Sequence, residues 1–219
     1  MEASTTTAAR SARGRRPARV SGDERERAIL ATAERLLGER SLHEISVDDL
    51  ARGAGISRPT FYFYFASKEA VLLALMDRLV AEARSGIELG MLARDPRGVV
   101  RRGIASVHDT FREHRPVALA SIDVRAKSPA VRELWSRVME GFVDESTAAI
   151  ESERARGAAP QGVPARDLAI ALNLMNERVF HASLSGEAPA IDEDAELDAL
   201  VAIWLLAIYG TTDPPSAVD

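Results

Sequence analysis

Apolar residues recur along most of the chain at the spacing of helices covered on one side. Ile29, Ala33, Leu36 and Leu37 share one helical face that ends at Gly38, which predicts a first helix over residues 23–38. No segment alternates apolar and polar residues as a half-buried strand would. Proline and glycine positions then delimit five further helices, over residues 96–113, 116–126, 129–156, 165–185 and 193–209. With the three described next, an all-α fold of about nine helices is expected.

Two short helices joined by a tight turn follow the first helix. Ser46 has the position of an N-cap with Asp49 three residues later, and this helix stops before the turn at residues 54–56. Ser57 caps the next helix, with Pro59 in its first turn. Two short helices around a glycine-containing turn are typical of a helix-turn-helix, whose second helix enters the major groove of DNA. A fourth, long helix begins at Lys68 after its cap.

Several side chains in this region have the chemistry to contact double-stranded DNA. The guanidinium of Arg58 can bind a guanine edge or a phosphate, and Thr60 can reach a base edge or a thymine methyl group. The helix N-termini at Ser46 and Ser57 attract phosphate. The DNA-binding candidates are Ser46, Ser57, Arg58, Pro59, Thr60, Tyr62, Tyr64 and Lys68.

An aromatic run over residues 61–65 closes the second short helix. We expect the three phenylalanines, Phe61, Phe63 and Phe65, to pack the small domain, and the two tyrosine hydroxyls, with Lys68, to reach phosphates. The alternative is an aromatic core plug whose hydroxyls face water.

The net charge of −5 conceals a basic N-terminal segment. Residues 1–20 hold five arginines and one acidic residue, a charge of +4, which leaves −9 on the remaining 199 residues. This segment has no periodicity, so residues 1–21 are predicted to be a disordered arm. Such an arm can neutralise phosphates or enter the minor groove, or it can be a solvated tail.

The second half of the chain carries candidates for an apolar ligand cavity. Aromatic and aliphatic stripes at helical spacing are compatible with ordinary core, but two amides, Asn173 and Asn176, interrupt an otherwise apolar helix. Buried amides can bond to backbone, bond across a subunit interface, or offer hydrogen bonds to a ligand. The ligand-binding candidates drawn from the pattern are Ile104, Val107, Phe111, Trp135, Met139, Phe142, Asn173, Asn176, Phe180 and His181.

The segment at residues 46–76, SVDDLARGAGISRPTFYFYFASKEAVLLALM, resembles the DNA-binding signature of the TetR family of repressors. The segments DLAIALNLMNERVF and IWLLAIYG extend the resemblance into the second half of the chain. It implies a helix-turn-helix domain over residues 22–67 and a ligand-binding and dimerisation domain over 68–210, and the sequence after the last helix, residues 211–219, is predicted to be a disordered tail. The resemblance also implies a homodimer through the last two helices, release from operator DNA by an apolar effector, and a ligand-contacting role for Trp204.

The chain departs from the resembled regulators where their channel is aromatic. Val100 and Val107 stand in place of large aromatic residues, as does His181, and Glu145 stands in place of a tyrosine. A wider cavity, more polar at one end, is expected, so the identity of the effector does not carry over.

For the dimer, apolar residues of the last two helices need cover, although packing within the chain is the alternative for some of them. These residues are Leu168, Leu172, Leu197, Leu200, Val201 and Leu205.

Other classes of function are less compatible with the sequence. The chain has no cysteine, no phosphate-binding glycine loop and no nucleophile elbow, and its four histidines form no metal-ligand spacing, so neither an enzyme, a cofactor nor a metal is expected. Its longest apolar run is too short for a membrane span, which favours the cytoplasm. The remaining alternative is a DNA-binding regulator whose helical body binds a protein partner, and activation instead of repression stays open.

Overall fold

The computed structural model describes residues 21–216, and within that range the chain forms nine α-helices, one short 3-10 helix and no strand. The all-α prediction is therefore confirmed for the described residues. The elements are α1 (Gly22–Leu37), α2 (Val47–Gly53), α3 (Arg58–Tyr64), α4 (Lys68–Ser85), η1 (Leu89–Met91), α5 (Pro96–Glu113), α6 (Arg115–Arg125), α7 (Pro129–Ala155), α8 (Ala165–Ser185) and α9 (Glu193–Tyr209).

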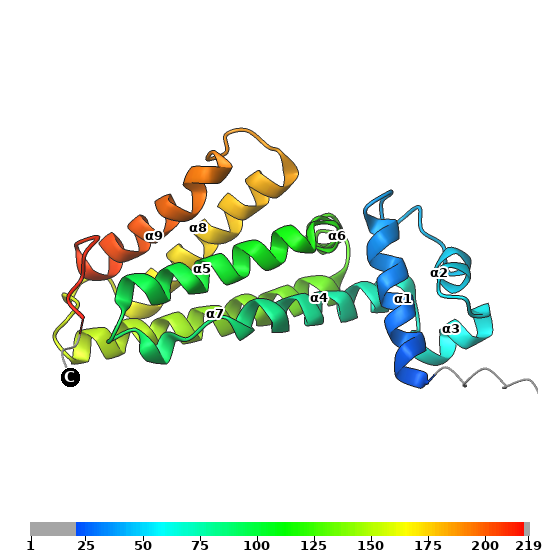
Figure 1. Cartoon of the computed structure of the whole chain (residues 1–219), viewed down its shortest axis with the longest axis horizontal. Helices are drawn as coiled ribbons and strands as arrows, with labels where there is room; N and C mark the ends of the chain where they lie inside the picture. The colour runs from blue at the N-terminus through cyan, green and yellow to red at the C-terminus, as the bar shows by residue number, and fades with distance from the viewer. Residues whose placement is uncertain (1–20, 217–219) are drawn as a thin grey trace, which may run out of the picture.

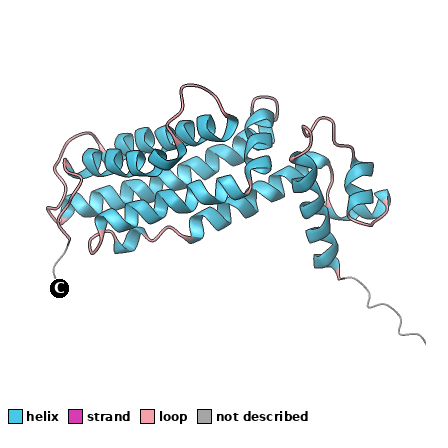
Figure 2. Cartoon of the chain, turned by 45° about the horizontal axis from the view of Figure 1, so that its top comes forward, coloured by secondary structure: helices cyan, strands magenta, loops and turns pink. Residues whose placement is uncertain are grey.

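The helices form a small head and a long body. Helices α1 to α3 gather at one end of the molecule, and α4 runs from this head along the body formed with α5 to α9 (Figure 1). Loops join the helices throughout (Figure 2). Helix α7, the longest, packs along α8, while α5 lies between α4 and α9.

Short capping sequences set where the first helices begin. Ser21 caps α1 in a reciprocal capping box with Glu24, as Ser46 caps α2 with Asp49. Ser21 therefore belongs to the head, although the sequence pattern had assigned it to the arm. The predicted arm otherwise covers residues 1–20, which lie outside the described range.

The tail also differs from its prediction over the part that is described. Residues 211–216 follow α9 without regular structure, but Pro214 is buried and the side chain of Arg97 donates a hydrogen bond of 3.1 Å to the carbonyl oxygen of Thr212. These contacts dock the start of the segment on α5. Residues 217–219 lie outside the described range.

Two apolar clusters make up the core. The first is continuous from the head into the body: buried residues of α1 and α3 pack with Val71, Leu72 and Leu75 of α4, and the same cluster reaches α6 and α7. The second lies at the far end of the body and joins α5, α7, α8 and α9. The predicted domain boundary at residue 67 thus coincides with the start of α4, but the apolar core continues across it.

A buried carboxylate ties α9 to α7 near the end of the chain. Glu153 is 1% exposed, and its carboxylate accepts hydrogen bonds from the Tyr209 hydroxyl at 2.9 Å and from Nε of Arg156 at 2.8 Å. Burial and the bond to Glu153 raise the pKa of Tyr209 well above its ordinary value. The hydroxyl therefore remains a hydrogen-bond donor to Glu153 at all physiological pH values.

We expect Tyr209→Phe to lower the free energy of unfolding by about 1–2 kcal/mol, because it removes one donor from a buried carboxylate. Urea unfolding at a fixed protein concentration measures this change. Tyr62→Phe is the matched control, since Tyr62 is 48% exposed, and it should change stability by less than about 0.5 kcal/mol. Equal stability of the Tyr209→Phe variant and the wild type would show that the network contributes nothing.

Candidate DNA-binding surface and ligand cavity

Helices α2 and α3 pack against each other across a four-residue connection, as the helix-turn-helix prediction requires. Gly55 in this connection has φ of +67°, a left-handed conformation that side chains disfavour. Ser57 caps α3 by accepting a hydrogen bond from the backbone N–H of Thr60 at 3.3 Å, and the two hydroxyls lie 2.8 Å apart. The N-terminal end of α3 therefore presents a compact group of exposed polar side chains, including that of Arg58.

The Arg58 side chain contacts two neighbouring residues of the head. Its Nη1 donates to Asp48 of α2 at 3.0 Å, its Nη2 donates to the Tyr62 hydroxyl at 3.4 Å, and its guanidinium carbon lies 5.8 Å from the centre of the Tyr62 ring. The bond to Tyr62 and the charge of Asp48 raise the pKa of Arg58. The sequence pattern did not identify Asp48, since it lies ten positions away on another helix.

The aromatic run divides differently from the prediction. Phe61 is fully buried and Phe65 is 8% exposed, so both pack the head as expected, but Phe63 is 83% exposed and that part of the prediction is wrong. Two positions along a helix turn the side chain by about 200°, so α3 cannot bury Phe61 and Phe63 on one face. Tyr62 is exposed beside Phe63, and Tyr64 packs partly against the core.

Lys68 has a structural role here, which corrects its assignment as a phosphate contact. Its ammonium donates to the carbonyl oxygens of Leu42 at 2.7 Å, His43 at 3.0 Å and Ile45 at 2.9 Å. These three bonds use all three N–H donors of a lysine side chain. Lys68 thus ties the loop before α2 to the start of α4.

The remaining DNA-binding candidates are exposed or partly exposed at the ends of α2 and α3. Ser46 is exposed, and its hydroxyl donates to Asp49 at 2.7 Å within the capping box. The hydrogen bonds from the side chain and the backbone of Ser46 lower the pKa of Asp49. Pro59 is exposed in the first turn of α3, next to Arg58 and Thr60.

An apolar cavity lies inside the body, between α4, α5, α6, α7 and α8. The space between its walls amounts to about 890 Å³, which includes the part open to solvent. Nine of the predicted ligand-binding residues line it: Val107, Phe111, Trp135, Met139, Phe142, Asn173, Asn176, Phe180 and His181. We call this the main cavity.

A second cavity adjoins the main one toward α9. The two share four lining residues, Val107, Phe142, Asn173 and Asn176, and the second cavity adds Ile104 and Trp204, the two remaining candidates. The structure therefore brings all eleven predicted residues around one connected site.

The polar groups of this site are partly used by the protein itself. The indole N–H of Trp204 donates to Oδ1 of Asn176 at 3.0 Å. The amide nitrogen of Asn173 donates to the Ser146 hydroxyl at 3.1 Å and to the Ala169 carbonyl at 2.9 Å. These three bonds orient both amides. The carbonyl oxygen of Asn173 and the amino group of Asn176 take no part in them.

Pattern reasoning missed the walls that α4 and α6 contribute. Met76, Leu79 and Val80 of α4 line the main cavity, although they read as ordinary core on an amphipathic helix. The two charged residues that line the main cavity neutralise each other, because Arg125 donates a hydrogen bond to Glu177 at 2.6 Å. The same guanidinium lies over the Trp135 ring, 5.3 Å from its centre. The other residues not predicted are Ala118, Ser121, Ile122 and Leu184.

The expected polar end of the site is formed by Glu145. This residue lines the second cavity and forms an ion pair with Arg84 of α4, whose guanidinium lies 5.2 Å from the centre of the Phe142 ring. His181 lines the main cavity and contacts Arg178 at 2.8 Å through Nδ1.

Helices α8 and α9 leave one apolar face uncovered. Leu172, Leu200, Val201 and Leu205 are buried within the chain, so for these four the alternative of packing within the chain holds. The exposed apolar residues are their neighbours, which lie at helical spacing on both helices: Ile170, Leu174, Ile203 and Leu206, which are 36–51% exposed. The N-terminal part of α9 is acidic, whereas residues 199–209 are entirely apolar, so this part of the helix has apolar side chains on its exposed side as well as on its buried side.

Two family models match the chain. The model of bacterial regulatory proteins of the tetR family matches residues 29–75, and the model of the C-terminal domain of the transcriptional regulator EthR matches residues 100–210. The two matches cover the helix-turn-helix with most of α4, and then the body from α5 to the end of α9. No helix among the described residues is long and apolar enough to cross a membrane.

Curated relatives match over nearly the whole length. The HTH-type transcriptional regulator EthR of Mycobacterium tuberculosis is 54% identical over 214 residues, which are 94% of this chain and 98% of that protein. The EthR of Mycolicibacterium smegmatis is 50% identical over 209 residues, covering 94% and 96%.

Solved structures share the fold at lower identity. A TetR-like transcriptional regulator from Rhodococcus sp. RHA1 has a TM-score of 0.66 and 24% identity, covering 88% of this chain and all of that chain. A transcriptional regulator from Saccharomonospora viridis in complex with choline has a TM-score of 0.68 and 24% identity, covering 81% and 94%. These structures show the shared fold, and the family matches with the 50–54% identical relatives show that the chain belongs to the TetR family of DNA-binding transcriptional regulators, which are not enzymes, and has an EthR-type C-terminal domain.

Proposed function

We propose that this regulator is a cytoplasmic homodimeric repressor, which binds operator DNA through α2 and α3 and releases it when a largely apolar small molecule enters the main cavity. One observation carries this proposal. Helix α4 packs in the core of the head through Val71, Leu72 and Leu75, and it lines the main cavity through Met76 and Leu79.

The DNA-binding part of the proposal rests on the exposed N-terminal end of α3. Arg58, Thr60 and Tyr62 are available there to contact base edges and phosphates, with Ser46 at the start of α2 and Tyr64 behind them. To reach a guanine or a phosphate, Arg58 exchanges its bond to Asp48 for one to DNA. The basic arm, outside the described residues, would add salt-sensitive affinity.

Arg58→Ala should weaken binding to the intergenic DNA upstream of the regulator's own gene by roughly 10- to 100-fold. The loss removes the side chain that can pair with guanine or phosphate. Fluorescence anisotropy at two salt concentrations measures it, and wild-type binding should fall steeply with salt.

Arg137→Ala is the matched control for this variant. Arg137 is an exposed arginine on α7, outside the helix-turn-helix, and its loss changes the net charge by the same amount. Equal affinity of the wild type and Arg58→Ala would contradict the assignment of Arg58, and equal weakening by both variants would show an effect of net charge alone.

The lining of the site supports a neutral effector of mostly apolar surface. Aromatic and aliphatic side chains dominate the walls, and the paired charges of Arg125 and Glu177 leave no net charge to attract an ion. The carbonyl oxygen of Asn173 and the amino group of Asn176 are the groups that would orient a polar atom of the ligand. The choline complex belongs to a neighbour that shares only the fold.

Coupling would run through α4. An effector that fits better when the cavity walls separate would shift the population toward dimers whose α4 helices have moved, and with them the heads. The effector shifts this equilibrium only by its differential affinity for the two states.

Met139→Trp should abolish the thermal stabilisation that neutral, mainly apolar compounds give to the wild type, because the larger side chain fills the main cavity. A scan of melting temperature against such a compound set measures this effect. Ser136→Trp places the same residue on an exposed position of α7 and should keep the response. Stabilisation that survives in Met139→Trp would mean that the compounds bind elsewhere.

The dimer is proposed on the apolar face of α8 and α9. Four exposed aliphatic side chains on adjacent helices would bury one another in a twofold interface, which sets two recognition helices on one side of the DNA. A protein partner on the body is the second candidate, and the two amides among the apolar lining residues of the main cavity favour the small molecule over it. If no compound raises the melting temperature while a partner protein changes DNA affinity, the second candidate is correct.

A further inference from the structure

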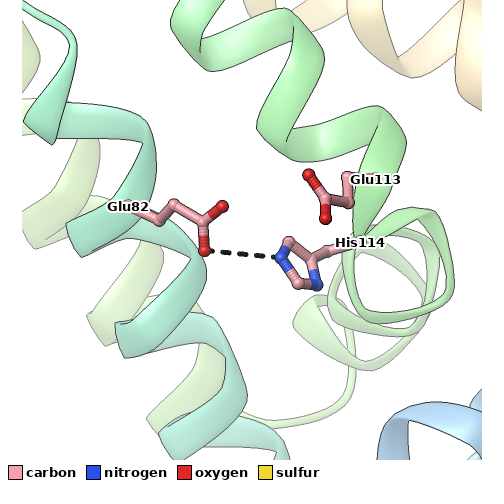
Figure 3. Close-up of side chains that lie close together, drawn as sticks. All are labelled: Glu82, Glu113 and His114. Atoms are coloured by element: carbon pink, nitrogen blue, oxygen red, sulfur yellow. Dashed lines mark ion pairs between the residues drawn. The ribbon is translucent and has the colours of Figure 1, made fainter.

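A histidine and three carboxylates from separate helices meet where the head joins the body. Glu34 comes from α1, Glu82 from α4, and Glu113 and His114 from the junction of α5 and α6. Figure 3 shows the carboxylates of Glu82 and Glu113 directed toward the His114 ring. No feature of the predicted DNA-binding surface or ligand cavity includes these residues.

The geometry points to a divalent metal site, and we propose that Glu82, Glu113 and His114 bind Zn²⁺. The ligand atoms of the three residues lie within 4.8 Å of one another. Nε2 of His114 and Oε2 of Glu82 are 3.4 Å apart. Tetrahedral Zn²⁺ with bonds of about 2.0–2.1 Å holds neighbouring ligand atoms about 3.3 Å apart, so this pair needs almost no movement to bind the ion.

The fourth residue supplies the outer partner that metal-bound histidines use. Nδ1 of His114 lies 2.5 Å from Oε1 of Glu34, on the ring edge away from Glu82. A carboxylate that accepts the N–H of Nδ1 fixes the tautomer whose Nε2 lone pair is available to a metal. Glu34 would thus hold the His114 ring through Nδ1, as a positioning residue, while Nε2 binds the ion.

The surroundings set the strength of the site. Glu82 and Glu113 are exposed, while His114 is half-buried, so water can supply the fourth ligand. Arg27 and Arg78 line the same groove and oppose a cation. With three protein ligands and two nearby arginines, we expect micromolar affinity and one ion per chain.

Such an ion would connect the parts of the molecule that the proposed repressor mechanism moves. It would bind α4 through Glu82 to the α5–α6 junction, and through the His114 to Glu34 bond it would hold α1 of the head. This consequence rests on the proposed function, whereas the site itself does not. Sequence spacing could not reveal the site, because Glu34, Glu82 and His114 lie on different helices or junctions and are spread over 80 positions of the chain.

The test is calorimetric titration of the full chain with ZnCl₂ after chelator treatment, at a pH where imidazole is neutral. We expect one Zn²⁺ per chain, a rise in melting temperature, and the intense visible absorption of tetrahedral Co²⁺ when cobalt replaces zinc. Glu82→Gln should weaken binding at least tenfold, and so should His114→Ala. Glu34→Gln should weaken binding about tenfold as an outer partner.

The control is His43→Ala, which removes an exposed histidine of the head and should leave Zn²⁺ affinity unchanged. Because Glu82 is an exposed side chain, Glu82→Gln keeps the test valid even if His114→Ala unfolds. Zn²⁺ affinity that is the same in the wild type and Glu82→Gln, or no stoichiometric binding, would overturn the proposal. Neither result depends on operator DNA or an effector, so the proposed function stands or falls separately.

Discussion

The structure depends on the packing of one helix, α4, in two places at once. Its first turns carry Val71 and Leu72 into the core of the head, where they are 1% exposed, and its middle turns carry Leu79 and Val80 into the wall of the main cavity. A well-packed core transmits displacement because it has no slack to absorb it. A change in the cavity that moves α4 must therefore move the head or break the head's core.

Much of the fold follows from short-range rules that the sequence displays. Capping serines, prolines in first turns and apolar periodicity located all nine helices, because each signal acts within one or two turns. Nine of the eighteen residues that line the main cavity were also predictable, since amides such as Asn173 and Asn176 on an apolar helix are costly without a partner. Trp204, which was predicted from the family resemblance, lines the adjoining second cavity.

Contacts between residues that are far apart in the sequence could not be predicted. Lys68 looked like a phosphate contact, yet three carbonyls of the preceding loop hold its ammonium. Phe63 looked like core, but its place on the far side of α3 leaves it in solvent. The contacts of Arg58 with Asp48 and of His114 with Glu34 join different helices, so only the assembled fold reveals them.

The distance between spin labels on the two heads of a dimer, measured by pulsed electron paramagnetic resonance, tests the central claim most directly. The chain has no cysteine, so Arg52→Cys, at a position 78% exposed on α2, carries one spin label per chain. We predict one main distance in the free protein, which shifts by several ångströms when a compound that stabilises the wild type and displaces DNA is added. A distance that stays constant while the compound binds and DNA is released would contradict coupling through α4.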